Sequence, residues 1–200
     1  MSRPSPPSDA GSGRLGFVGL AMEAFAFLMR MGFDVVRREG SFVRFESATV
    51  FVNVYHGRSS YQVGLELGRV QVGDMYSLYE VLSAVAPAEI QQARCQTTDV
   101  AVLERCLLAI ADTIRRTCSE LLSGDAATFE KLQSAVLPRR QAATIRSQFG
   151  AIIDRADRAW EAKDFAQAAD LYEQATPGLD ETRKRRLEYL RGRRVQDSQK

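Results

Sequence analysis

The sequence predicts an α+β fold, in which an N-terminal helix and a four-stranded antiparallel meander precede an all-helical second half. Between residues 33 and 68, apolar and polar residues alternate with a period of two, which is typical of half-buried strands. On both sides of that segment, apolar residues recur every three or four positions, which is typical of amphipathic helices. Because 45% of the 200 residues are hydrophobic and 26% are charged, as in ordinary globular domains, we expect a packed core.

The first helix is expected over residues 16–31, and Gly32 ends it. It follows residues 1–13, which are rich in Pro, Ser and Gly and are expected to be disordered. The apolar stretch Leu15–Met29 is too short to span a bilayer and lacks a clear signal-peptide cleavage site. It therefore predicts a buried helix in a cytoplasmic protein without membrane contact. The expected buried face consists of Leu20, Ala24, Phe27, Leu28 and Met31.

Four strands follow this helix, and their turns predict which residues face one another. The expected strands are 33–38, 41–46, 49–56 and 61–68, joined by turns at Glu39-Gly40 and Ser47-Ala48 and by a loop over 57–60. Counting from these turns places two rows of apolar residues on the face that the first helix covers. The rows are Val36, Val43, Val52 and Leu65, and Phe45, Val50 and Leu67.

The opposite face of the sheet is predicted to mix polar and aromatic side chains. Glycines within its strands accommodate a ligand, an aromatic neighbour or a helix at close approach. Tyrosine is common in binding hot spots, and Tyr55, Tyr61, Tyr76 and Tyr79 all lie near the end of the sheet. The expected neighbours are Arg44 with Phe51 and Glu66, Asn53 with Gly64, and Tyr55 with Gln62.

Helix start and stop signals organise the chain after the sheet. Ser77 and Glu80 have the spacing of a capping box, in which a hydroxyl and a carboxylate satisfy free amides of the first turn. From Asp99, a three-four apolar repeat predicts a helix that continues to Gly124. Asp125 can cap the helix after it.

Pro138 is expected to separate that helix from a long helical segment, because proline interrupts the hydrogen bonds of a helix interior. Two further helices are expected near 165–175 and 180–191. We therefore expect an α+β domain over residues 14–92 and a helical region over residues 93–195.

Residues 159–175 resemble the middle of a tetratricopeptide repeat. In that family, an aromatic residue after the inter-helix turn is followed by small residues that let two helices approach. Here these positions hold Phe165, Ala168, Tyr172 and Ala175. The closing proline comes early, at Pro177, and no second copy follows at the period of about 34 residues. Because solenoid repeats bury their faces against neighbours, the resemblance implies one helical hairpin, near 151–176, docked on the rest of the chain.

The whole chain also resembles a group of uncharacterised bacterial proteins. The resemblance rests on Val43–Ser47, Phe51–Tyr61, Leu171–Glu173 and Arg185–Tyr189. In general form the chain is similar to immunity proteins of bacterial toxin systems, which neutralise a toxin by binding it. The resemblance implies a non-enzymatic protein-binding module with another protein as partner, and no catalytic residues.

The only histidine, His56, ends the third strand and is expected to lie opposite Tyr61, beside Arg58. An imidazole, a guanidinium and a phenol could together hold a carboxylate or a phosphate. A small hydrolase or transferase at His56 is an alternative, but it requires a positioned acid or nucleophile, and Glu66 points to the other face. In a further interpretation, His56 only fixes the turn by hydrogen bonds. The expected binding surface is Tyr55, His56, Arg58, Tyr61, Gln62 and Glu66.

The C-terminal tail supports a second alternative, a nucleic-acid-binding protein. Residues 183–200 contain eight Lys or Arg and two acids, although the chain as a whole carries only +2. A solvated helix end is the competing interpretation, and we expect it to be the more common one. The residues that would contact phosphates are Arg183, Lys184, Arg185, Arg186, Arg191, Arg193 and Arg194.

No cofactor or metal is expected. Cys95, Cys106 and Cys118 are an odd number of cysteines without a Cys-x-x-Cys pair, which predicts reduced thiols rather than a disulfide framework or a zinc site. Gly11–Gly16 matches a dinucleotide-binding spacing, but no strand precedes it, so the mechanism behind that motif is missing.

Overall fold

The computed structural model describes residues 16–91 and 94–197. The chain divides into two compact units, an N-terminal unit, Met1–Ala135, and a C-terminal unit, Val136–Lys200. The segment expected to be disordered, 1–13, lies outside the described residues. The division falls after Ala135 rather than near residue 92, because helices that follow residue 92 pack on the sheet.

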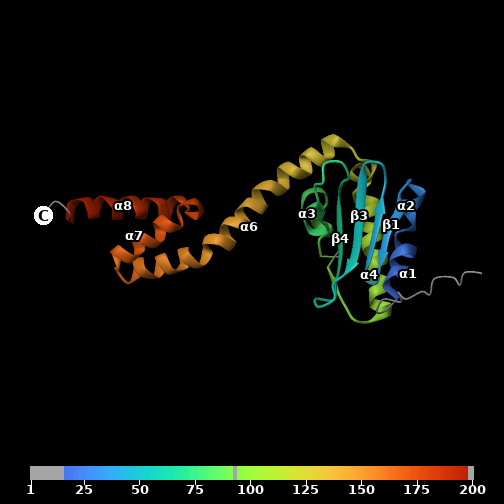
Figure 1. Cartoon of the computed structure of the whole chain (residues 1–200), viewed down its shortest axis with the longest axis horizontal. Helices are drawn as coiled ribbons and strands as arrows, with labels where there is room; N and C mark the ends of the chain where they lie inside the picture. Colours follow the sequence, from blue (N-terminus) through green and yellow to red (C-terminus); the bar gives the residue numbers. More distant parts are fainter. Residues whose placement is uncertain (1–15, 92–93, 198–200) are drawn as a thin grey trace, which may run out of the picture. The chain divides into compact units, whose positions relative to one another are not determined.

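The predicted α+β class is confirmed, with an antiparallel sheet as the centre of the N-terminal unit (Figure 1). Its strands run in the order β1-β2-β3-β4-β5, and β6 also pairs with β4. The two-residue strands β5 and β6 were not expected, because they hold no periodic pattern of their own. The bounds are β1 Asp34–Glu39, β2 Phe42–Glu46, β3 Val50–His56, β4 Gln62–Arg69, β5 Tyr76–Ser77 and β6 Cys95–Gln96.

Each of the three predicted hairpin turns lies one residue too early. In the first turn, Glu39 pairs with Phe42 around Gly40-Ser41. In the second turn, Glu46 pairs with Phe51, because the Ser47 Oγ accepts a hydrogen bond from the amide of Val50 at 3.0 Å and closes the turn later. A shift of one residue at a turn moves every cross-strand partner by two positions. Side chains therefore keep their predicted face while their neighbours change.

The third loop shows the same shift. Gly57 donates to the Gln62 carbonyl at 2.9 Å, and Tyr61 adopts a positive φ of 52° before the chain enters β4. His56 consequently lies opposite Val63, and the expected pairing of His56 with Tyr61 is wrong. Val36 also departs from the predicted row, because a β-bulge between Val35 and Arg37 leaves it 54% exposed.

Four helices cover one face of the sheet: α1 Phe17–Ala24, α2 Ala26–Arg30, α4 Val100–Thr117 and α5 Ser119–Ser123 (Figure 1). As predicted, the apolar N-terminal stretch is a buried helical segment. Its buried positions, however, are Phe17, Ala21, Phe25, Phe27 and Leu28 rather than Leu20, Ala24 and Met31. The apolar periodicity could not distinguish the buried face of the helical segment from its exposed face, because nearly every residue from 17 to 31 is apolar.

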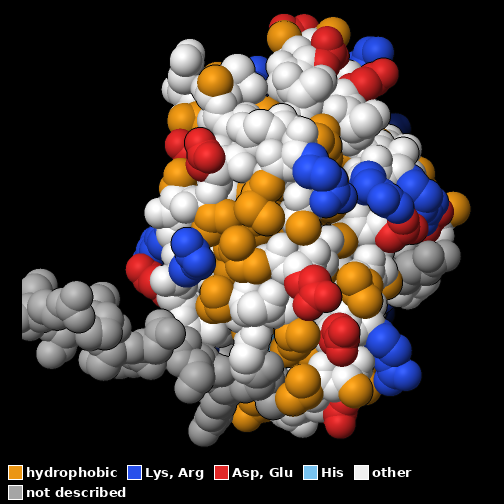
Figure 2. All heavy atoms as spheres, turned by 90° about the vertical axis from the view of Figure 1, so that its right-hand side faces the viewer, with side chains coloured by type: hydrophobic (Ala, Val, Ile, Leu, Met, Phe, Trp, Pro, Cys, Tyr) orange, Lys and Arg blue, Asp and Glu red, His pale blue; other side chains and the backbone are white. Residues whose placement is uncertain are grey.

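The outer side of α1 and α2 is rich in apolar side chains. Figure 2 shows orange side chains gathered on the face of the N-terminal unit that lies on the right of Figure 1, the side of α1 and α2. Met29 and Met31 are 42% and 44% exposed. Glu23 and Arg30 are the two charged residues between 17 and 31.

The predicted helix signals are mostly confirmed. Gly32 ends α2 with a φ of 88°, and Ser77 and Glu80 form a complete capping box at the start of α3, Leu78–Val85. Asp99 caps α4 through the amide of Val102. The predicted helix to Gly124 is divided at Cys118 into α4 and α5, and a short 3-10 turn, Pro87–Glu89, follows α3.

In the C-terminal unit, α6 Ala126–Glu161, which begins in the N-terminal unit, is followed by α7 Phe165–Gln174, a 3-10 turn Thr176–Gly178 and α8 Glu181–Asp197. The two later helices begin where they were predicted, and α8 extends six residues beyond the predicted end at 191. Pro138 lies inside α6, so the expected break is wrong. An interior proline removes one helical hydrogen bond and crowds the preceding turn, at a cost of about 3 kcal/mol. The 36 residues of this helix offset that cost.

Five of the eleven buried residues in the core of the C-terminal unit are alanines, which let the helices approach closely. Ala156, Ala168 and Tyr172 are fully buried, and Trp160 packs edge-on against Phe165. The full set of buried residues is Ile153, Ala156, Ala159, Ala168, Ala169, Leu171, Tyr172, Ala175, Leu179, Leu187 and Leu190. Among the described residues, no helix is both long and apolar enough to cross a bilayer.

Candidate functional site

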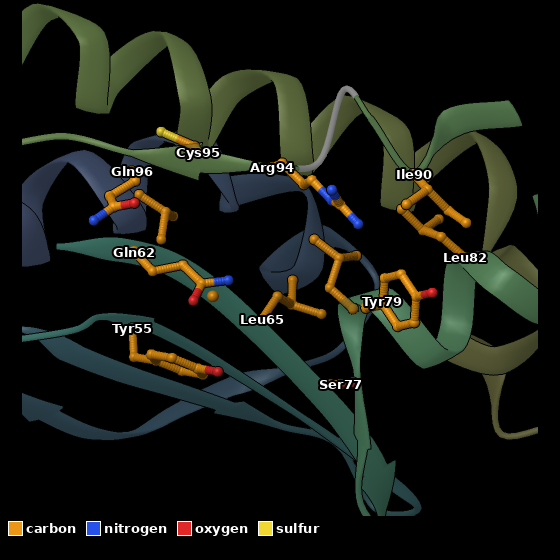
Figure 3. Close-up of a pocket in the computed structure, with 13 residues that line it drawn as sticks. Tyr55, Gln62, Leu65, Ser77, Tyr79, Leu82, Ile90, Arg94, Cys95 and Gln96 are labelled. Carbon is orange, nitrogen blue, oxygen red and sulfur yellow. The ribbon is translucent and has the colours of Figure 1, made fainter. Parts of the chain in front are cut away.

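A pocket of about 590 Å³ lies in the N-terminal unit, beside β4 and between α3 and β6 (Figure 3). We call it the β4–β6 pocket. Two of the predicted site residues, Tyr55 and Gln62, line it, whereas His56, Arg58, Tyr61 and Glu66 do not. The lining residues are Tyr55, Gln62, Val63, Gly64, Leu65, Ser77, Leu78, Tyr79, Leu82, Ile90, Arg94, Cys95 and Gln96.

The polar groups of this pocket come from different elements. Figure 3 shows the side chains of Gln62 and Arg94 on the same side of the β4 ribbon as Leu65, whereas the ring of Tyr55 lies on the other side of that ribbon. Gln62 and Gln96 face one another across β4 and β6. Volume and composition match those of small-ligand and peptide pockets, which combine an apolar surface with a few placed polar groups.

Among the described residues that line the pocket, Arg94 is the only one with a charged side chain, and it is exposed. Its guanidinium carbon lies 5.9 Å from the ring centroid of Tyr79, which is itself 56% exposed. No ion pair of Arg94 occurs among the described residues. The pocket therefore presents one positive charge next to an exposed aromatic ring.

The Ser77 hydroxyl is not available for chemistry, because it donates to Glu80 Oε2 at 2.9 Å in the capping box. Cys95 is bonded in a disulfide. The thirteen described residues of the lining include no carboxylate, imidazole or free thiol. Its side chains supply hydrogen bonds, one charge and apolar contact.

The ring of Tyr55 covers Gly64 on the next strand and forms one wall of the pocket. A Cβ added at Gly64 would lie 2.2 Å from the Cζ of Tyr55, so only glycine admits the ring in this position. Burial, and then the nearby Glu66 carboxylate, raise the pKa of the Tyr55 phenol. The strand glycines were expected to accommodate a ligand, an aromatic neighbour or a helix, and Gly64 accommodates an aromatic neighbour.

We predict that Gly64→Ala lowers the free energy of unfolding by about 1–3 kcal/mol, because the new methyl group displaces the Tyr55 ring. In a Tyr55→Ala background, the same substitution should cost little. Urea unfolding followed by circular dichroism measures this double-mutant cycle. As a control, Gly19→Ala in α1 has nothing within 4 Å of its new Cβ and should be neutral or stabilising. An equal cost of Gly64→Ala in both backgrounds would contradict the contact.

His56 is buried and stabilises the position of β6, which forms one wall of the pocket. Its Nε2 lies 2.9 Å from the Thr97 carbonyl oxygen and 3.1 Å from that of Tyr61. Both oxygens can only accept, so we assign the proton to Nε2, which donates to them. The imidazole also stacks on the buried ring of Phe17, at 6.1 Å between centroids. These contacts favour the interpretation that His56 fixes the turn, and here it also joins that turn to β6.

The β6 wall is further held by a disulfide between Cys95 and Cys106, which ties it to α4. The expectation of reduced thiols is wrong in this structure. The spacing of the cysteines could not show the bond, because β6 comes beside α4 only through its pairing with β4. Cys118 is a free thiol whose pKa is raised by burial. Disulfides are typical of oxidising compartments, and the cytoplasmic location stays a prediction.

The remaining predicted residues lie on the open face of the sheet or in its turn. Asn53 bridges Arg44 and Glu66, because its side chain contacts Arg44 Nη1 at 3.5 Å and Glu66 Oε2 at 3.3 Å. The predicted direct pair of Arg44 with Glu66 is therefore wrong, and Arg44 instead pairs with Glu46 at 2.8 Å. Arg58 is exposed in the turn.

Most of the basic residues of α8 are bound within the C-terminal unit. Arg183 and Arg186 both contact Asp157, at 2.6 and 3.1 Å. Arg193 lies over the ring of Phe165. Among the described residues, Arg185 alone of the predicted set lacks an ion pair or ring contact. The other pairs are Lys184 with Glu181, Arg191 with Glu173 and Arg194 with Asp170.

This pairing favours a structural role for the basic tail. The positive charges are offset by carboxylates on α6, α7 and the start of α8, which leaves few of them free to release counterions from a phosphate backbone. Within the described part of the chain, no group of three or more His, Cys, Asp or Glu side chains is placed to hold a metal ion.

Sequence reasoning found Tyr55, Gln62 and, as a tyrosine near the capping box, Tyr79. It missed Arg94 and Gln96, which enter the site only because β6 adds to the edge of β4. Comparisons with protein-family models, curated proteins and solved structures found no match to this chain, so the family and tetratricopeptide resemblances stay predictions.

Proposed function

We propose that this chain is a non-enzymatic protein-binding module whose partner docks at the β4–β6 pocket. The observation that carries the proposal is the exposed pair of Tyr79 and Arg94 at the pocket, beside two glutamine amides. Tyrosine and arginine are the residues most enriched in binding hot spots. The general likeness in form to immunity proteins makes a toxin the first class of partner to test.

The chemistry of the lining supports binding over catalysis. General acid–base or nucleophilic catalysis needs a titrating group or an activated nucleophile in reach of the substrate. The pocket instead offers phenols, amides and one guanidinium, and the Ser77 hydroxyl is engaged in the capping box. The walls are also held in place, by the Tyr55–Gly64 contact on one side and by His56 and the disulfide on the other. Preorganised walls reduce the entropy that binding must overcome.

Affinity purification with the full chain tests this proposal. A partner from the source cells should be retained by the wild type and by Arg58→Ala, and lost at least tenfold with Tyr79→Ala or Arg94→Ala. Arg58 is the matched control, because it is also an exposed arginine of the N-terminal unit but lies outside the pocket. Circular dichroism should show all variants folded. A partner retained equally by the Tyr79 and Arg94 variants would place the binding surface elsewhere.

A further inference from the structure

The β4–β6 pocket has a charge preference that narrows the chemistry of its occupant. The single charged group among its thirteen lining residues is the guanidinium of Arg94. No carboxylate of the described residues pairs with it. An unpaired guanidinium in a pocket without acids favours an anionic group, and its fork of donors matches the planar carboxylate.

The groups around Arg94 are suited to a polypeptide. The amides of Gln62 and Gln96 lie opposite one another on paired strands, and each can donate to and accept from a peptide backbone. Apolar surface for a ligand is supplied by the ring of Tyr79, which is 56% exposed, beside the buried side chains of Leu65, Leu78 and Leu82. A bulky apolar side chain of a ligand can bury this ring surface.

We infer that the pocket binds an extended segment of a partner protein in which an Asp or Glu lies next to a bulky apolar residue. The inference rests on the proposed function and adds the chemistry of the partner. The carboxylate pairs with Arg94, the apolar side chain lies against the ring of Tyr79, and the backbone bonds to Gln62 and Gln96. We assign the charge to a side chain rather than to a chain terminus, because terminal carboxylates are captured by clustered backbone amides, whereas the positive group here is a side chain.

Nuclear magnetic resonance titration of the full chain tests the inference with defined probes. The probes are acetyl-Leu-Glu-Phe-amide, its neutral counterpart acetyl-Leu-Gln-Phe-amide, and acetyl-Leu-Gln-Phe with a free carboxyl terminus. The acidic-side-chain peptide should shift the side-chain amide signals of Gln62 and Gln96. It should bind about tenfold or more tightly than the neutral peptide, as expected for hydrogen bonds to a charged group. Arg94→Gln should remove this difference, and Arg58→Gln should keep it.

Three results would overturn the inference. Equal binding of the acidic and neutral peptides, or no shift of Gln62 and Gln96 with either, would show that the pocket does not select an acidic side chain. Preferred binding of the free-terminus peptide would assign the carboxylate to a chain end instead. In each case the proposed function would still be tested separately, because the loss of a partner with Tyr79→Ala does not depend on these peptides.

Discussion

Asp157→Ala is expected to lower the free energy of unfolding of the C-terminal unit by about 2–4 kcal/mol. The carboxylate accepts from Arg183, from Arg186 at 3.1 Å and from the buried Tyr172 hydroxyl at 2.7 Å. It joins α6, α7 and α8 at one point. Removing it leaves two guanidinium groups and a phenol without their shared acceptor, and lost pairing of partly buried charges is costly.

The measurement is denaturant unfolding followed by the fluorescence of Trp160. This residue is the only tryptophan of the chain, and it lies in the C-terminal unit beside Phe165, so its signal reports on this unit. Asp154→Ala, an exposed position one turn earlier in α6, is the matched control and should change stability by less than about 0.5 kcal/mol. Equal effects of the two substitutions would contradict a central role of Asp157.

The same carboxylate predicts a loss of stability in acid. Burial alone raises the pKa of Asp157, but hydrogen bonds from Arg183 and Tyr172 outweigh it, so the pKa lies below its ordinary value. A folded-state pKa below the unfolded value contributes stability that is present above the unfolded value of about 3.9 and is lost as the pH falls through the folded pKa. Between pH 5 and pH 2, the wild type should therefore lose more stability than Asp157→Asn.

His56→Ala is the second change with a large expected effect, a loss of about 2–4 kcal/mol in the N-terminal unit. The substitution removes a buried ring that stacks on Phe17 and a donor shared by the carbonyls of Tyr61 and Thr97. Hydrogen exchange of the Thr97 amide, which bonds to the Tyr61 carbonyl at 2.9 Å, should accelerate because β6 loses one of its attachments.

A conservative variant separates the ring from its hydrogen bonds. His56→Phe keeps aromatic packing but has no donor, so it should recover part of the stability while exchange at Thr97 stays fast. Arg58→Ala in the adjacent turn should leave both observables unchanged, because Arg58 is exposed. A stable His56→Ala variant with slow Thr97 exchange would show that the imidazole does not hold β6.

The sequence predicted well what depends on local chemistry. The capping box at Ser77 and the helix end at Gly32 needed only the properties of the residues concerned. Strand alternation placed the side chains of the predicted core rows on the correct face, except that of Val36. The predicted positions of the turns were wrong by one residue, because a hydroxyl such as that of Ser47 can close a turn at more than one place. The break predicted at Pro138 is absent because the other hydrogen bonds of a 36-residue helix offset the cost of an interior proline, about 3 kcal/mol.

The candidate site was only partly predictable, since it is made by contacts between distant segments. The strand pattern brought Tyr55 and Gln62 into consideration, but β6 is only two residues long and carries no periodic signal. Its position depends on pairing with β4, on the bond of His56 to Thr97 and on the Cys95–Cys106 disulfide. Without the position of β6, nothing distinguishes Arg94 from the other arginines of the chain.

Site-specific photo-crosslinking tests most directly whether the β4–β6 pocket is the binding surface. Full-length protein carries benzoyl-phenylalanine at Tyr79, or at Tyr189 as a control with a similar exposed fraction, 53% against 56%. We predict a crosslinked partner from Tyr79 that disappears when Arg94 is also replaced by glutamate, and none from Tyr189. A partner that crosslinks from Tyr189 alone, or from Tyr79 regardless of Arg94, would contradict the assignment of this pocket.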